Sequence, residues 1–202
     1  MSFLRVSKDP ETRREDILKA ALELFREEGF EKVTVESIAK GAGIAKGSVY
    51  NYFKTKESVY EAVIADIASR NLDIARAILT DKKASPKERL TRYIDWAFQL
   101  SEQQEKSLSR VLEPEANPSQ RQMYLRALDE GISQMLPYFE QLLEEGAANA
   151  EFEISNARFT AAAMLGAFRG IHVEFYNGLQ IDMTTGKSYL CDFLSRLLGT
   201  KF

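Results

Sequence analysis

The sequence predicts an all-α fold, because apolar residues recur at helical spacing along nearly the whole chain and no segment alternates with period two for long enough to make a strand. Its 202 residues, 45% of them hydrophobic, can bury a sizeable core in one or two compact domains. Capping residues, glycines and prolines then divide the chain into about nine helices, the second and third of them short.

The first helix has both a start and a stop signal. Thr12 and Glu15 fit a capping box, while Pro10 suits a first helical position slightly earlier in the chain. Apolar residues from Ile17 onwards form a stripe that can be buried, and Gly29 ends the helix.

Two short helices and a long one are expected next. Thr34 can cap the second helix, and the glycines of "GAGI" predict a turn before a third helix at about residues 45–53. Thr55 and Glu57 can start the fourth helix, whose apolar pattern continues to near residue 79.

The remaining helices follow the prolines. Ser85, Pro86 and Glu88 together mark one helix start, and Pro114 with Pro118 indicates a break. Asn117 is expected to cap one later helix and Ser155 to cap the next. The last helix is expected to include residues 190–198.

Charge is distributed unevenly along the chain. The formal net charge is −3, yet residues 32–56 hold five lysines and a single acid, Glu36, which gives this segment a local charge of +4. A basic patch of this kind is typical of a surface that binds DNA phosphates, although a solvated lysine-rich face with surface tyrosines would have the same composition.

The third helix carries polar and aromatic residues where solvent is expected. Val49 and Phe53 are four residues apart and should face the core of the N-terminal domain. The opposite side would then present its polar and aromatic residues, and two short helices joined by a glycine turn are the outline of a helix-turn-helix.

The segment "VTVESIAKGAGIAKGSVYNYFKTKESVYEAV" resembles the DNA-binding signature of the TetR family of bacterial transcriptional regulators. The resemblance covers about residues 12–64, and "GSVYNYFKTKE" is its most specific part. It implies an N-terminal three-helix helix-turn-helix domain over residues 1–56. It also implies a C-terminal helical domain for ligand binding and dimerisation over residues 57–202.

The same resemblance assigns roles to individual residues. It implies phosphate contacts from Thr34, Tyr50, Tyr52 and Lys56, and an approach to bases or backbone by Lys46, Gly47 and Ser48. Asn51 is a candidate for a base contact, and the role of Glu36 is left open because an acid would repel DNA.

A homodimer is expected from the last two helices. Ala162, Gly166 and Gly170 follow one another at four-residue spacing, and small residues let helices approach closely. The last helix adds an apolar face that a symmetry mate can cover, or that packs within one subunit, formed by Phe193, Leu194 and Leu197.

A ligand pocket is expected among the middle helices, which are rich in aromatic residues and methionine. The candidates are Tyr93, Trp96, Met123, Tyr124, Phe168, Arg169, His172 and Tyr176. Any one of them can instead belong to the core. Arg169 and His172 can bind an anionic or polar ligand group, a partner across the dimer, or core groups.

Several classes of protein fit the sequence poorly. One histidine, a single cysteine (Cys191) and no glycine-rich phosphate loop argue against an enzyme, a metal site or a bound cofactor. The chain has no run of eighteen apolar residues and no signal peptide, so we expect no membrane association and a cytoplasmic location.

The sequence therefore predicts a ligand-responsive transcriptional regulator, a repressor that binds a palindromic operator in double-stranded DNA as a homodimer. A small apolar or aromatic effector is expected to release it. The alternative is a helical regulator controlled by a protein partner.

Overall fold

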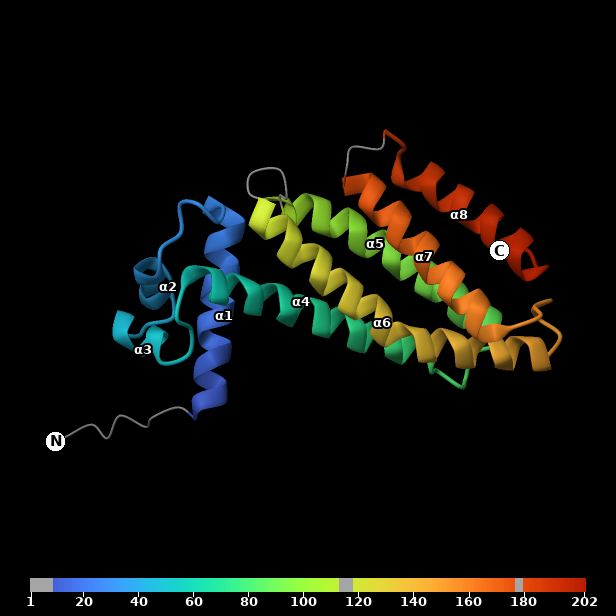
Figure 1. Cartoon of the computed structure of the whole chain (residues 1–202), viewed down its shortest axis with the longest axis horizontal. Coiled ribbons are helices and arrows are strands. Elements are labelled where there is room, and N and C mark those ends of the chain that lie inside the picture. Colours follow the sequence, from blue (N-terminus) through green and yellow to red (C-terminus); the bar gives the residue numbers. More distant parts are fainter. Residues whose placement is uncertain (1–8, 113–117, 177–179) are drawn as a thin grey trace. The chain divides into compact units, whose positions relative to one another are not determined.

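A computed structural model describes residues 9–112, 118–176 and 180–202, and its regular structure in these ranges is entirely α-helical (Figure 1). These ranges contain eight helices, close to the nine expected. Residues 86–112 form one continuous helix, because no glycine or proline interrupts the segment after Pro86. The helices are α1 Pro10–Glu28, α2 Val35–Gly41, α3 Lys46–Tyr50, α4 Lys56–Leu79, α5 Pro86–Leu112, α6 Pro118–Ala148, α7 Ala157–Tyr176 and α8 Met183–Leu198.

The chain divides into two compact units. The first combines the chain up to residue 67 with residues 106–124, and the second combines residues 68–105 with residues 125–202. Helices α4, α5 and α6 therefore each contribute residues to both units. The functional boundary expected near residue 56 stays a prediction.

Helix α1 starts earlier than Thr12. Asp9 is its N-cap, and the Asp9 carboxylate accepts hydrogen bonds from the backbone N–H groups of Glu11 and Thr12, both at 3.0 Å. Pro10 occupies the first helical position, where its missing N–H leaves no donor unsatisfied. Thr12 is therefore not the cap, and its hydroxyl donates to the Asp9 carboxylate at 2.5 Å. Gly29, at φ 78°, ends the helix as expected.

The core of the first unit contains an aromatic cluster of Phe25, Phe30 and Tyr60. The Tyr60 ring lies edge-on to both phenylalanines, with centroid distances of 5.6 Å to Phe25 and 5.1 Å to Phe30. The buried Tyr60 hydroxyl donates to the Val111 carbonyl oxygen at 2.5 Å, and burial raises its pKa to about 12. This bond ties α4 to the end of α5 within the first unit.

The core of the second unit is mostly aliphatic, with two buried phenylalanines, Phe139 and Phe152. Arg89 is buried beside it, where its guanidinium donates to the Leu79 carbonyl at 2.9 Å and to the Glu145 carboxylate at 2.5 Å. A buried cation of this kind is stable only when it is paired, so Glu145 holds α5 and α6 together at this point. Among the described helices, none has a stretch long and apolar enough to cross a membrane.

Candidate nucleic-acid interface

The helix-turn-helix is built from α2, the turn after it and α3. Thr34 caps α2 as expected: its hydroxyl accepts from the Ser37 backbone N–H at 3.1 Å, and the Ser37 hydroxyl accepts from the Thr34 N–H at 3.0 Å. Gly43 has φ 66°, in the left-handed region that a residue with a side chain rarely adopts. The turn at Gly43 thereby sets α3 at an angle to α2, and α2 packs against both α1 and α3 (Figure 1).

Helix α3 is shorter than expected, since residues 46–50 are helical and residues 51 and 52 form a turn. Its orientation is nevertheless the predicted one. Val49 is fully buried and Phe53 is 6% exposed, so both face the core of the first unit. Lys46, Tyr50 and Asn51 are exposed on the other side.

The other residues predicted to contact DNA lie on the same short stretch of chain or flank it. Thr34 and Gly47 are exposed, whereas Ser48, Tyr52 and Lys56 are half-buried. The structure thus brings most of the predicted contacts to the surface, and contact with DNA itself stays a prediction for each of them.

Lys56, the first residue of α4, already has partners within the protein. Its ammonium donates to the Phe30 carbonyl at 2.8 Å and to the Glu31 carbonyl at 3.4 Å, and it lies 4.1 Å from the centroid of the Phe30 ring. These contacts join α4 to the segment that follows α1. Any phosphate contact of Lys56 would use the remaining N–H of an ammonium that has a structural role.

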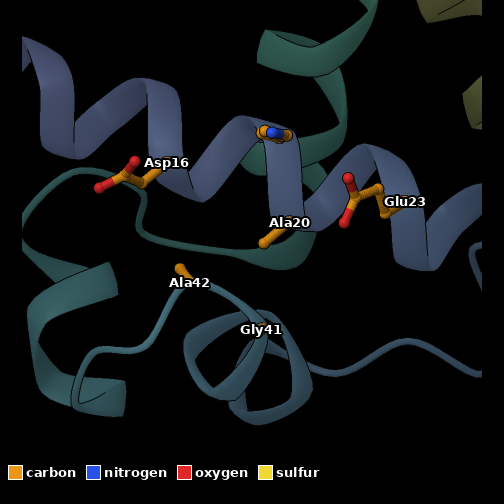
Figure 2. Close-up of a pocket in the computed structure, with 6 residues that line it drawn as sticks. Asp16, Ala20, Glu23, Gly41 and Ala42 are labelled. Carbon is orange, nitrogen blue, oxygen red and sulfur yellow. The ribbon is translucent and has the colours of Figure 1, made fainter.

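A depression lies between α1 and the end of α2. Figure 2 shows Asp16, Ala20 and Glu23 along α1, with Gly41 and Ala42 on the facing segment. The helices approach closely here, because a Cβ atom added to Gly41 would lie 3.3 Å from the Ala20 Cβ. None of the residues that line the depression is predicted to contact DNA.

Three of the predicted ligand-binding residues form an aromatic cluster in the second unit. The Tyr93 ring centroid lies 5.8 Å from Trp96, 5.8 Å from Phe168 and 5.0 Å from the buried Phe139. The Tyr93 hydroxyl has no hydrogen-bond partner among the described residues, and burial raises its pKa to about 12. These rings are partly exposed apart from Phe139.

Of the other predicted ligand-binding residues, two lie in the first unit and three on α7. Met123 and Tyr124 belong to the first unit, and burial raises the pKa of Tyr124. Arg169 binds the Asp129 carboxylate through Nε at 2.5 Å, in an ion pair between two partly exposed side chains. Burial lowers the pKa of His172, which favours the neutral imidazole. The side chain of Tyr176 lies outside the described residues.

The small residues predicted for the dimer interface are exposed. Ala162, Gly166 and Gly170 face solvent on α7, and a Cβ atom added to either glycine would meet no other atom within 4 Å. On α8, Phe193 is 44% exposed, and Leu197 is partly buried against the core. Leu194 is fully buried in the core of its own subunit, so it offers no surface to a partner.

Two further exposed aromatic residues were missed by the sequence reasoning. Phe159 on α7 is 76% exposed and Tyr189 on α8 is 63% exposed. Helical spacing could have identified Phe159. It precedes Ala162 by three residues and Gly166 by seven, which puts all three on one helix face. We call the exposed side chains of Phe159, Ala162, Ala163, Gly166, Gly170, Tyr189 and Phe193 the α7–α8 face.

Known proteins match both the signature and the fold. The family model described as "Bacterial regulatory proteins, tetR family" matches residues 17–63. The HTH-type transcriptional repressor KstR2 of Mycolicibacterium smegmatis is 31% identical over 139 residues, which are 61% of this chain and 67% of that relative. A transcriptional regulator from Cytophaga hutchinsonii aligns with a TM-score of 0.73 and 20% identity, over 95% of this chain and 98% of its own. FadR from Bacillus subtilis, solved with stearoyl-CoA, aligns with a TM-score of 0.60 and 24% identity, over 93% of this chain and 99% of its own.

Proposed function

The chain belongs to the TetR family of bacterial regulatory proteins, and from this we propose that it is a ligand-responsive transcriptional repressor. In this proposal a homodimer binds a palindromic operator in the cytoplasm, and a small apolar or aromatic effector releases it. The family consists of DNA-binding regulators, and the KstR2 relative is named a transcriptional repressor.

The exposed side of α3 is the observation that carries the proposal. Lys46, Tyr50 and Asn51 are exposed while Val49 and Phe53 anchor the same short segment in the core. A helix held in this way can place its polar side chains in the major groove without unfolding its own domain. Lys46 would bind phosphate, and the Asn51 amide can both donate to and accept from a base edge.

The α7–α8 face supports the homodimer. Phe159, Tyr189 and Phe193 are large apolar groups that stay in contact with water in a single subunit. The exposed small residues of α7 let a second helix approach closely, as in the bundles that pair two helices from each subunit. A symmetric dimer would also present two copies of α3 to the two half-sites of a palindrome.

The aromatic cluster of the second unit supports an apolar or aromatic effector. Tyr93, Trp96 and Phe168 offer ring faces and edges, and the Tyr93 hydroxyl can bind one polar group of a ligand. Arg169 is paired with Asp129 at the surface, so an anionic ligand group would have to compete with that carboxylate for the guanidinium. FadR, which shares the fold, was solved with stearoyl-CoA, whose acyl chain is apolar. Fatty acids and their derivatives are therefore among the first effectors to test.

An electrophoretic shift experiment on genomic fragments tests the DNA-binding part. We expect the full chain to retain a small set of fragments in the presence of excess random DNA. Asn51→Ala should cost about 1 to 3 kcal/mol on these fragments and little on random DNA, since it removes a base contact alone. Asn149→Ala, an exposed asparagine in the second unit, is the matched control. If no fragment is retained selectively, the protein-partner alternative is favoured.

Trp96, the only tryptophan, provides a test of the effector. Fatty acids, acyl-CoA thioesters and aromatic compounds can be screened by Trp96 fluorescence and then by release of labelled operator. A ligand that controls a promoter should shift operator affinity by about tens- to thousandsfold. Helix α4 supplies a path for this effect, because it belongs to the first unit up to residue 67 and to the second thereafter. Binders that change the fluorescence but leave operator affinity within about twofold would contradict the proposed coupling.

A further inference from the structure

Glu36 is the acid that interrupts the basic segment of residues 32–56. It lies in the first turn of α2, and its side chain is 77% exposed. It is not needed for the core or for the α2 cap, because Thr34 and Ser37 supply both members of the capping box. An acid in the first turn favours the helix end, but an exposed carboxylate on a surface otherwise suited to phosphates still calls for a functional explanation.

The structure gives Glu36 a specific partner, Lys46. The Glu36 carboxylate lies 3.6 Å from the Lys46 ammonium, so the two side chains form an ion pair between α2 and α3. Lys46 begins α3 and is itself half-exposed, at 52%. The lysine that begins α3 is therefore already paired within the protein when DNA is absent.

DNA must compete with Glu36 for this lysine. A phosphate that takes Lys46 leaves the Glu36 carboxylate without its cation, close to the negative backbone of the duplex. An exposed pair of this kind changes an equilibrium by up to about fivefold, and the repulsion left after its rupture adds to that factor at low salt. The pair is thus weak enough to break and strong enough to reduce affinity.

We propose that the Glu36–Lys46 ion pair restrains sequence-independent DNA binding by the free regulator. This inference rests on the proposed function and adds a negative determinant to it. Complexes with random DNA are held almost entirely by phosphate contacts, so the cost of breaking the pair is not offset by base contacts there. A chain without the restraint would spend more of its time on non-operator DNA.

The test measures the affinity of the full chain for a labelled random-sequence duplex of about 30 base pairs, from about 50 to 200 mM salt. The variants are Glu36→Gln, Lys46→Met, both together, and Glu57→Gln as the matched control. Glu57 is an exposed glutamate in the first turn of α4, so the same change there alters the net charge and the helix end in the same way. Thermal melts would confirm that the variants remain folded.

We expect Glu36→Gln to tighten binding about three- to tenfold at low salt, and to steepen the salt slope by up to about 0.9 as Lys46 gains a phosphate. In the Lys46→Met background the same change should have less than half of this effect. Glu57→Gln should alter affinity by less than about twofold.

Four results would overturn the inference. An equal gain from Glu36→Gln with and without Lys46 would mean that Glu36 simply repels DNA, and an equal gain from Glu57→Gln would mean that only net charge matters. Unchanged affinity in Glu36→Gln would show that the pair has no effect on binding. Failure of the native chain to bind the duplex even at low salt would overturn the proposed function as well, which separates the two failures.

Discussion

The aromatic core of the first unit, which holds the helix-turn-helix and is called the DNA-binding unit below, differs from the α7–α8 face in its exposure to water. Phe25, Phe30 and Tyr60 are buried against one another in the first unit, with ring centroids 5.1 to 5.7 Å apart. Phe159 and Tyr189 are mostly exposed to water. The DNA-binding unit therefore completes its own core, whereas the second unit leaves apolar surface that we propose a second copy of the chain covers.

The largest expected effect comes from truncating one phenylalanine in each region. Phe25→Ala should lower the free energy of unfolding by about 3 to 5 kcal/mol, because it leaves a cavity in a closed core. Phe159→Ala should change it by less than about 0.5 kcal/mol when the chain is monomeric, since water already surrounds that ring. Urea denaturation at low protein concentration measures both. Equal losses would show that the two regions do not differ as described.

Dimerisation is the next test, and Gly166 is its probe. A leucine at Gly166 meets open space in the single subunit but would overpack a helix contact across the dimer, at a cost of about 1 to 3 kcal/mol in each subunit. We expect Gly166→Leu to be folded and monomeric in sedimentation experiments at micromolar concentration. Gly131→Leu is the control, because Gly131 also lies within a helix with open space around it. A native chain that sediments as a monomer would contradict the dimer.

Several features of the first unit could be predicted from the sequence. Periodicity and capping signals predicted an all-α chain, the Thr34 cap and the inward orientation of Val49 and Phe53, because each of these depends on residues a few positions apart. The Asp9 cap was missed because two capping signals competed within one turn.

Contacts between distant segments could not be read from the sequence. Lys56 binds the carbonyl of Phe30, and Tyr60 binds that of Val111, at separations of 26 and 51 residues. Leu194 and Phe193 are neighbours in an apolar run, and only packing decides that the first is buried and the second exposed. Exposure of an apolar residue is a property of the folded surface. The residues of the proposed dimer interface could therefore be chosen only from the structure.

The hydrogen bond from Tyr60 to Val111 is expected to stabilise the core of the DNA-binding unit. Tyr60→Phe keeps the ring but leaves the Val111 carbonyl without its donor, which should cost about 1 to 3 kcal/mol of stability. Tyr52→Phe, at a half-buried ring with no hydrogen bond among the described residues, is the control and should cost less. Denaturation measures the loss, and hydrogen exchange should show faster opening at the end of α5. Equal stability of Tyr60→Phe and the native chain would mean that the bond contributes nothing net.

The smallest expected effect separates the structural role of Thr34 from its predicted DNA contact. Helices α2 and α4 begin with the same arrangement, in which Thr34 pairs with Ser37 and Thr55 pairs with Ser58. Thr34→Ala and Thr55→Ala should therefore each lower the unfolding free energy by about 1 kcal/mol.

Of these two threonines only Thr34 is predicted to contact phosphate, so only Thr34→Ala should also weaken binding to the random duplex. The salt slope should stay nearly unchanged, because the lost hydroxyl is neutral and releases no counterion. Thr34→Ser keeps the hydroxyl and should restore both the cap and the DNA affinity. Duplex titrations beside urea denaturation of all three variants measure the two effects separately. If Thr34→Ala and Thr55→Ala weaken DNA binding equally, Thr34 acts through the helix cap alone, and the exposed contacts are confined to the α3 segment.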